Sequence, residues 1–560
     1  MKKILTIFSF FLLAIIAGKQ SYSQPIEEWT RRYNGLLDST DVAVDIVVDN
    51  NGNTYVTGYS KTLLGLLTQI FTLSYDTDGT ERWRKEYGGL LWDEGAAITL
   101  DNTQQFVYVT GFTTRLLALT HTDYVIIKYR ASDGQQMWVR TYDNGLLGDD
   151  KATAIAVDAQ NNPVITGYSS NIILVSTHDY ATVKYDQSNG NQLWAARYNG
   201  PANKDDSAYA IAVDNSNNVV VTGSSKNGTL FPTDDDYATV KYNSNGNQQW
   251  AARYDNGGED RAYAIVVDGS GNVIVTGESE GSGTNYDYAT VKYNSSNGSQ
   301  QWAARYNGTG NGYDRAYAIV VDGSGNPIVT GESNGSGTGQ DYATVKYNTT
   351  NGSQQWAARY NGTGNNEDRA YAIVVDSSSN SYVTGSSRSS GSAGSEDYAT
   401  LQYDSNGNQQ WVMRYNGTGS NEDRAYAIVV DSPGNVYVTG SSRNGTLLGS
   451  EDYLTIKYSE KSNPVKIISN EIPVRCSLYQ NYPNPFNPST NIRFDVPAPS
   501  IVKITVYNTL GNQVAILLNN KLNPGTFEVQ WDAGGFPSGI YFYRIIIGDI
   551  TETKKMILLK

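Results

Sequence analysis

Short runs that alternate between apolar and polar residues recur along most of this chain. In one stretch they read WAARY at 250–254, AYAIVVD at 262–268, NVIVTGES at 272–279 and DYATVKY at 287–293. Their β-branched and aromatic residues are typical of short β-strands. The connections after the second and fourth runs are short and rich in Gly, Ser and Asn, as hairpins require. Each stretch therefore predicts four antiparallel strands.

A tryptophan marks every copy of this pattern. The eight copies begin 52 to 56 residues apart, at Trp29, Trp83, Trp138, Trp194, Trp250, Trp302, Trp356 and Trp411. In the run at 262–267 both sets of alternate positions are apolar, which favours a strand packed between two neighbours. A period above 40 residues with four strands matches a propeller blade rather than a solenoid coil. The sequence predicts an all-β fold with an eight-bladed β-propeller over residues 24–458.

The two ends of the repeat region complement one another. Residues 28–33 form an isolated tryptophan-containing strand, and the last copy ends at 452–458 with no such strand after it. If the N-terminal strand completes the last blade, it removes an open sheet edge that would invite aggregation. We expect the ring to be closed in this way.

The repeat AYAIVVDxxGNVxVTG, followed by DYATVKY and a GNQQW turn, resembles the SBBP-type β-propeller repeats of bacterial surface and secreted proteins. The resemblance covers residues 29–458 and implies the fold, but that family has no single activity. The segment KYNSSNGSQQW is also similar to the docking motif of eight-bladed quinoprotein dehydrogenases. Those enzymes carry vicinal cysteines, which the single Cys476 cannot supply.

The repeat stops after Tyr458. Residues 459–475 have the polar composition of a linker, and residues 476–560 hold alternating runs between Gly and Asn turns. These runs predict a small immunoglobulin-like β-sandwich.

The C-terminal module carries a set of distinctive residues at Asn484, Pro485, Phe486, Asn487, Pro488, Gly511, Gly539 and Tyr541. With these residues it closely resembles the type A C-terminal sorting domain of the type IX secretion system of Bacteroidetes-like bacteria. The resemblance implies export by the type IX machinery and a secreted, extracellular or outer-membrane surface location. An accessory immunoglobulin-like domain without a targeting role is the alternative.

The N-terminus has the features of a signal peptide over residues 1–23. Lys2 and Lys3 precede an apolar stretch at 4–17, and small residues lead to an expected cleavage after Ser23. The alternative is a retained N-terminal anchor. No later stretch is long and apolar enough for a membrane span, so we expect no transmembrane segment after cleavage.

The charge balance narrows the class of partner. With 42 Lys and Arg against 56 Asp and Glu, the net charge is −14. A nucleic-acid partner would need a basic footprint, so we expect none. The single cysteine excludes an intrachain disulfide and a CxxC redox motif.

Two rings of carboxylates are the main candidates for chemistry. One aspartate opens the second strand of every copy and another ends it, as Asp260 and Asp268 do in one copy. No cofactor is identified, but Ca²⁺ prefers several oxygen ligands and would suit such a ring. The alternative is that each carboxylate accepts hydrogen bonds from a neighbouring turn or blade. His121 and His178, the two histidines, lie at different places in their copies and do not indicate a catalytic triad.

Sequence variation among the copies indicates where a ligand would bind. The connections before the second strand and between the third and fourth runs differ from copy to copy, and in an antiparallel blade both emerge on one face. We therefore predict a ligand-binding face there, suited to a cation or a basic, polar ligand. Its candidate residues are Asp206, Asp260, Asp314, Asp368 and Asp423.

The first copies differ from the others by paired leucines in these loops. An apolar patch on one sector would suggest a partner surface, and divergence without function is the alternative. The leucines are Leu36, Leu37, Leu63, Leu64, Leu66, Leu67, Leu90, Leu91, Leu146 and Leu147.

The sequence predicts a secreted or cell-surface protein without catalysis, which binds a glycan, peptide or protein ligand. The alternative is a secreted propeller enzyme, either a hydrolase or a quinoprotein-like oxidoreductase. A third class is a purely structural adhesive layer, which would have no concave ligand site. An enzyme needs unique polar residues that converge from several blades, and such residues are scarce in this repeat.

Overall fold

The computed structural model describes most of the chain from Pro25 onward. Every regular element in this part is a β-strand, which confirms the predicted all-β fold. The strands fall into two compact modules, a ring module at Pro25–Glu460 and a C-terminal module at Lys461–Lys560. The described residues are 25–35, 39–61, 67–88, 91–114, 121–145, 148–170, 177–228, 234–281, 283–389, 396–417, 422–443, 451–459, 465–469, 471–509, 513–533, 536–548 and 550–559.

The first 32 strands form four-stranded antiparallel sheets, here numbered 1 to 8, with strands A to D in each. Sheet 1 contains β2 (Asp41–Val48), β3 (Thr54–Lys61), β4 (Thr68–Tyr75) and β5 (Glu81–Gly88); sheet 2, β6 (Glu94–Leu100), β7 (Phe106–Thr114), β8 (Thr122–Arg130) and β9 (Gln136–Tyr142); sheet 3, β10 (Asp150–Val157), β11 (Pro163–Ser170), β12 (His178–Tyr185) and β13 (Gln192–Tyr198); sheet 4, β14 (Asp206–Val213), β15 (Val219–Lys226), β16 (Asp235–Tyr242) and β17 (Gln248–Tyr254).

The second half of the ring module repeats this order. Sheet 5 contains β18 (Asp260–Val267), β19 (Val273–Gly281), β20 (Thr284–Tyr293) and β21 (Gln300–Tyr306); sheet 6, β22 (Asp314–Val321), β23 (Pro327–Gly335), β24 (Gly339–Tyr347) and β25 (Gln354–Tyr360); sheet 7, β26 (Asp368–Val375), β27 (Ser381–Arg388), β28 (Glu396–Tyr403) and β29 (Gln409–Tyr415); sheet 8, β30 (Asp423–Val430), β31 (Val436–Arg443), β32 (Glu451–Ser459) and β1 (Ile26–Tyr33).

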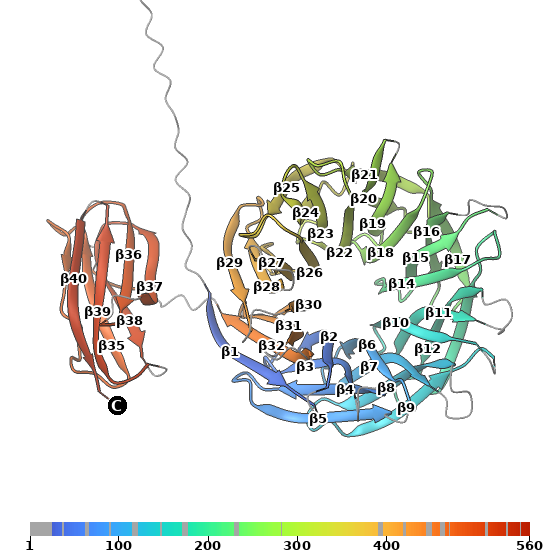
Figure 1. The fold of residues 1–560 in the computed structure, drawn as a ribbon, viewed down its shortest axis with the longest axis horizontal. Helices are drawn as coiled ribbons and strands as arrows, with labels where there is room; N and C mark the ends of the chain where they lie inside the picture. Colours follow the sequence, from blue (N-terminus) through green and yellow to red (C-terminus); the bar gives the residue numbers. More distant parts are fainter. Residues whose placement is uncertain are drawn as a thin grey trace, which may run out of the picture. The chain divides into compact units, whose positions relative to one another are not determined.

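Figure 1 shows these sheets set around a common centre, with the A strands innermost and the D strands outermost. The ring module has two faces. The D–A and B–C connections lie on one, here called the loop face. The A–B and C–D turns lie on the other, here called the turn face.

A bulge in each A strand explains the recurring glycine of strand B. In sheet 5, Ala262 pairs with Gly277 and Ala264 pairs with Thr276, so Tyr263 is left out of register. A Cβ atom on Gly277 would lie 1.9 Å from the backbone oxygen of Arg261. Only glycine permits this close approach of two strands.

Neighbouring sheets are joined by side chains that converge on one turn carbonyl. Trp302 Nε1 and Lys292 Nζ, both in sheet 5, donate to the backbone oxygen of Thr349 in sheet 6 at 3.1 and 2.9 Å. Tyr288 donates its hydroxyl to Ala343 O of sheet 6 at 3.1 Å. We call this set of three hydrogen bonds the clasp. It recurs from sheets 2, 3, 4, 6 and 8 to the next sheet. Sheet 1 has Ser74 and Ile70 at the lysine and tyrosine positions, and sheet 7 has Gln402 at the lysine position.

A glycine lets the tryptophan of the clasp lie against the turn. Gly352 has a φ of +70°, and a Cβ there would lie 2.7 Å from the indole of Trp302. A side chain at this position would therefore be strained and would also displace the ring.

Strand β1 supplies the tryptophan of the clasp that links sheet 8 to sheet 1. It pairs antiparallel with β32, with Trp29 opposite Lys457. Trp29 Nε1 and Lys457 Nζ donate to Thr77 O of sheet 1 at 3.0 and 2.9 Å. Trp29 also belongs to a buried cluster that contains Phe71 of sheet 1 and Tyr453 of sheet 8. The first and last sheets thus share one hydrophobic core.

The C-terminal module packs two four-stranded sheets around a single core. One sheet has the order β33 (Lys466–Ser469), β38 (Gly525–Asp532), β35 (Ser489–Val496) and β34 (Ser477–Leu478). The other has β37 (Gln513–Leu522), β36 (Ser500–Tyr507), β39 (Gly539–Ile547) and β40 (Ile550–Leu558). Their shared core includes Phe494, Val506, Trp531 and Tyr543. Strand β33 lies inside the stretch 459–475 that composition predicts as a linker.

Because the same clasp links sheets 8 and 1 and sheets 5 and 6, we predict that two tryptophan substitutions lower the free energy of unfolding by the same amount. Trp29→Ala and Trp302→Ala each remove a largely buried indole, with 6% and 7% exposure, and one clasp hydrogen bond. We expect each to lower the free energy of unfolding by about 3–5 kcal/mol in denaturant titrations. A cost below about 1 kcal/mol for Trp29→Ala alone would contradict a supporting role for β1.

Candidate binding face

The aspartate that opens each A strand is buried beneath the loop that precedes it. The five predicted ligand-binding carboxylates have no exposed surface, and each accepts a hydrogen bond of 2.6–2.8 Å from a backbone N–H of that loop. The acceptors are Asp206, Asp260, Asp314, Asp368 and Asp423, and the donors are Gly200, Asn256, Gly308, Gly362 and Gly417.

In two of these aspartates the second oxygen also reaches the end of strand B. Asp314 accepts from Asn334 N at 2.8 Å, and Asp368 accepts from Arg388 N at 3.1 Å. These carboxylates therefore hold the D–A loop against the end of strand B, and a ligand would have to displace that loop to touch them. Their role in ligand binding stays a prediction.

Burial also changes the acidity of this ring. It raises the pKa of Asp206 and Asp260 to about 6. It raises the pKa of Asp314, Asp368 and Asp423 as well, although hydrogen bonds from Ser333, Ser387 and Ser442 oppose the rise. Burial disfavours the ionised form of these covered carboxylates, which weakens the ring as a cation site, because a cation prefers ionised oxygens.

The aspartates at the opposite ends of the A strands brace the turns. Asp268 accepts from the backbone N–H groups of Ser270 and Asn272, each at 2.9 Å, and lies 2.7 Å from Lys292 Nζ. Burial would raise the pKa of Asp268, but the hydrogen bonds from Lys292 and Asn272 outweigh it and keep the pKa below its ordinary value.

A chain of ion pairs follows the loop face of sheets 4 to 8. Arg315 illustrates it, because it lies 2.5 Å from Glu278 of sheet 5 and 3.2 Å from Glu332 of its own sheet. Both glutamates are buried. The chain runs through Asp235, Arg261, Glu278, Arg315, Glu332, Arg369, Glu367, Arg388, Glu396, Arg424, Glu422, Arg443 and Glu451.

A ladder of tyrosines accompanies these ion pairs at the bulge of strand A. Successive ring centroids lie 5.7–6.0 Å apart, within the range for favourable aromatic contacts. The ladder consists of Tyr209, Tyr263, Tyr317, Tyr371 and Tyr426.

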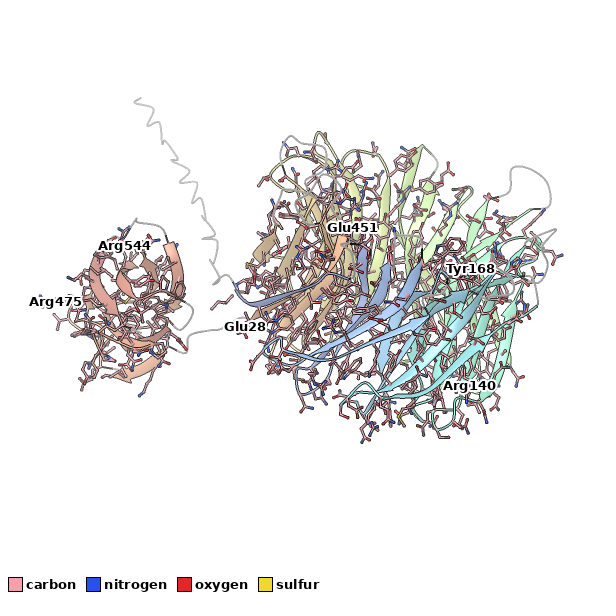
Figure 2. The ribbon with its side chains drawn as sticks, turned by 60° about the horizontal axis from the view of Figure 1, so that its bottom comes forward. Glu28, Arg140, Tyr168, Glu451, Arg475 and Arg544 are labelled. Carbon is pink, nitrogen blue, oxygen red and sulfur yellow. The ribbon has the colours of Figure 1, made fainter. Side chains whose placement is uncertain are left out.

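Sheets 1 to 3 replace the ion pairs by aromatic residues. At the position of Glu278 they carry Tyr59, Phe112 and Tyr168, and each of these side chains is partly exposed. Figure 2 shows Tyr168 and Glu451 toward one end of the sheets and Arg140 toward the other. The loop face thus has a charged sector over sheets 4 to 8 and an aromatic sector over sheets 1 to 3.

Polar groups border the aromatic sector. Lys151 Nζ lies 4.3 Å from the centroid of the Phe112 ring, a cation–π contact. The His178 ring packs edge-on against Tyr168 at 4.9 Å, and its Nδ1 lies 3.7 Å from Asp205. Trp92 is 49% exposed in the connection before β6.

The other histidine lies in the neighbouring sheet. His121 Nδ1 is 3.9 Å from Asp149 Oδ1, as His178 Nδ1 is 3.7 Å from Asp205 Oδ1. Each histidine therefore has one nearby carboxylate, and sequence reasoning alone does not give these partners because they come from the D–A connection of the next sheet.

Two groups of carboxylates lie close enough together for a shared cation. The oxygens of Asp123, Asp143 and Asp150 lie within 4.8 Å of one another, as do those of Asp236, Asp255 and Asp260. In the second group Arg253 Nη2 already lies 2.6 Å from Asp236. Calcium binding stays a prediction.

Most of the predicted leucine patch lies outside the described residues. Leu67 and Leu91 are described, and both are partly exposed. Leu36, Leu37, Leu63, Leu64, Leu66, Leu90, Leu146 and Leu147 fall outside, as does the predicted signal peptide at 1–23.

The sorting motif packs against the core of the C-terminal module. Phe486 is buried against Trp531, with ring centroids 5.5 Å apart, and its backbone bonds to Ile557 and Leu559 at 2.9 Å. Asn484 Oδ1 accepts from Ile557 N at 3.0 Å. The motif therefore fixes the strand that ends this module.

The other motif residues have separate places. The Tyr541 hydroxyl donates to Pro537 O at 2.8 Å, and its ring packs on Trp531. Gly539 begins β39, Asn487 and Pro488 precede β35, and Pro485 adjoins Phe486. Gly511 lies outside the described residues.

Family comparisons agree with this division. Residues 480–559 match the secretion system C-terminal sorting domain, and residues 28–65 and 410–447 match the beta-propeller repeat. Residues 125–396 match the model of the outer membrane protein assembly factor BamB. The chain therefore carries SBBP-type β-propeller repeats and a type IX C-terminal sorting domain, as the sequence predicted. This sorting domain assigns it to a secreted or outer-membrane surface location.

Individual proteins show weaker similarity. An uncharacterized WD repeat-containing protein of Acanthamoeba polyphaga mimivirus is 25% identical over 353 residues, which cover 45% of this chain and 25% of that protein. PorZ, a surface component of the type IX secretion system of Porphyromonas gingivalis, is 14% identical with a TM-score of 0.36, covering 94% of this chain and 60% of PorZ. The WD40 domain of SCAP from fission yeast is 8% identical with a TM-score of 0.39, covering 76% and 98%.

The matched region spans only a quarter of the curated relative and 60% of PorZ. Within the part of the chain that the structure describes, no helix is long and apolar enough to span a membrane.

The two aspartate rings predict opposite responses to pH. The pKa of Asp260 is higher in the folded than in the unfolded chain, so its contribution to stability falls as pH rises from about 4 to 6. The pKa of Asp268 is lowered, so its contribution is lost as pH falls below about 4. We expect the melting temperature of the wild type, relative to Asp260→Asn, to decrease between pH 4 and 6.5. Relative to Asp268→Asn, the melting temperature of the wild type should decrease on acidification below pH 4. If the melting temperatures of the wild type and both variants change in parallel with pH, the two aspartates do not have opposite pKa shifts.

The sorting domain predicts the fate of a truncated chain. Because β33 belongs to the C-terminal module, the clean truncation removes residues 461–560. In a host with the type IX pathway, we expect this variant to accumulate in the periplasm while the full chain reaches the surface, as measured by surface proteolysis and fractionation. Undiminished surface delivery would show that the module is not the sorting signal.

Proposed function

We propose that this protein is a noncatalytic binding protein of the cell surface or its surroundings, built on an eight-bladed propeller that β1 closes. Its ligand, a surface glycan, peptide or protein, binds to the aromatic sector of the loop face over sheets 1 to 3. The C-terminal module, an immunoglobulin-like sandwich in this proposal, delivers the propeller to the type IX machinery.

One observation carries the proposal. Buried glutamates of sheets 5 and 6 form ion pairs with Arg261, Arg315 and Arg369. At the same position of strand B, sheets 1 to 3 carry Tyr59, Phe112 and Tyr168. Ion pairs that satisfy one another leave few groups for a ligand. Partly exposed aromatic side chains, in contrast, offer large contact area at a low entropic cost and are enriched in binding sites.

The geometry of the polar groups supports binding rather than catalysis. His121 and His178 lie in different sheets, each beside one carboxylate at 3.7–3.9 Å. A hydrolytic triad requires a nucleophile and an orienting acid around one histidine. The secreted hydrolase or quinoprotein-like oxidoreductase is therefore the less favoured candidate.

A position-matched substitution tests the proposal. Ser224 occupies the same position in sheet 4, so Tyr59→Ser, Phe112→Ser and Tyr168→Ser change the aromatic sector to a residue that the repeat already accepts. We expect the triple variant to lose at least tenfold in affinity for ligands found with glycan and peptide arrays, while its melting temperature stays close to that of the wild type.

The control variant changes exposed apolar residues elsewhere. Met137 and Leu193 are 46% and 50% exposed on D strands. Met137→Gln with Leu193→Gln should leave ligand binding unchanged. Equal loss in both variants, or full binding by the triple variant, would reject the aromatic sector as the site.

A further inference from the structure

The turn face holds a second candidate site, between sheets 1 and 2. A cavity of about 260 Å³ lies there, and its lining includes Asp49, Tyr55, Arg82, Phe106, Arg130 and Ser132. The equivalent position between sheets 4 and 5 has a cavity of about 310 Å³ lined by polar residues of the ordinary repeat, among them Asp214, Asn218 and Lys241.

Three residues of the first cavity depart from the repeat. Phe106 stands where the seven other copies have Asn, and Arg130 stands where six others have Asp or Asn. Arg82 stands where four others have Gln. They come from three different strands of two sheets, so independent drift at each would not by itself bring them to one cavity.

The structure also holds two of these side chains in place. Arg82 Nη1 donates to Tyr55 OH and Ser74 Oγ, both at 3.0 Å. Lys128 Nζ lies 3.7 Å from the centroid of the Phe106 ring. A site whose groups are fixed before binding loses less entropy when the ligand arrives.

The cavity is biased toward negatively charged ligands. Its one carboxylate, Asp49, already accepts from Asn51 N and Asn53 N at 2.9 Å and from Tyr55 OH at 3.0 Å. The side chains of Arg82 and Arg130 also line the cavity. Arg130 Nε lies 3.3 Å from Asp133, whose side chain is 54% exposed. Guanidinium matches a carboxylate through paired N–H donors, and aromatic rings favour a flat apolar body.

We propose that this cavity binds a small ligand in which a carboxylate is joined to an aromatic or similarly flat ring. Arg82 and Arg130 hold the carboxylate, and Tyr55 and Phe106 contact the ring. The cavity volume suits a molecule of about one ring, since it lies just below the usual range for ligand pockets of roughly 300–1,000 Å³. This inference does not rest on the proposed function, because the site is on the opposite face.

Three probes separate the contributions to binding. Benzoate carries both charge and ring, acetate lacks the ring, and benzamide lacks the charge. With the full mature chain in calorimetry or ligand-observed NMR, we expect benzoate to bind at least tenfold more tightly than either of the others. Benzoate that fails to bind, or that binds no better than acetate or benzamide, would overturn the proposal.

The repeat supplies variants that should still fold. Arg130→Asn introduces the residue of other copies, and Ser74→Lys with Arg82→Gln restores the lysine that pairs with the turn aspartate elsewhere, as Lys292 does with Asp268. Each should weaken benzoate at least tenfold without a fall in melting temperature. Arg140→Gln, which alters an arginine between sheets 2 and 3 whose Nη2 contacts Asn189 O, should have no effect. Equal benzoate affinity in all variants would reject the site.

Discussion

The ring module depends on the clasp, in which side chains of one sheet donate hydrogen bonds to a turn carbonyl of the next sheet. Trp302 and Lys292 share the backbone oxygen of Thr349, and Tyr288 reaches Ala343 O. The indole, the lysine stem and the phenol also bury apolar surface between the sheets. The same side chains therefore contribute both hydrogen bonds and apolar packing. Because the buried clusters of the ring module draw residues from two neighbouring sheets, the apolar faces of a sheet are covered only in the presence of both neighbours.

This dependence sets which positions can vary. The C–D turn receives the clasp, and Asp268 of the A–B turn braces the same region with Lys292, so the Asn, Asp and Gly residues of both turns recur. The D–A and B–C loops give no clasp and differ between sheets. The aromatic sector over sheets 1 to 3 occurs where the sequence is released from this constraint, which is where a binding surface can evolve without loss of the ring.

The position of the predicted ligand-binding aspartates in the structure shows a limit of sequence reasoning. A residue repeated in every copy, such as Asp260 or Asp314, is equally compatible with a ring of ligand groups and with a repeated loop anchor. The structure places these carboxylates under the loops, with Asn256 N and Gly308 N as donors at 2.8 Å. Burial depends on how the loop folds back over strand A, and the alternation of residues along the strand carries no information about that.

The sequence alone determined the four-stranded repeat, the position of the tryptophans, the complementary strand at 28–33 and the sorting motif, since each depends on local periodicity or on contiguous residues. Only the tertiary structure decided which exceptions to the repeat lie together. Arg82, Phe106 and Arg130 are scattered over 49 positions of the sequence and meet at one cavity because two sheets pack side by side. Contacts between sheets join residues of different copies, and a pattern within one copy cannot specify them.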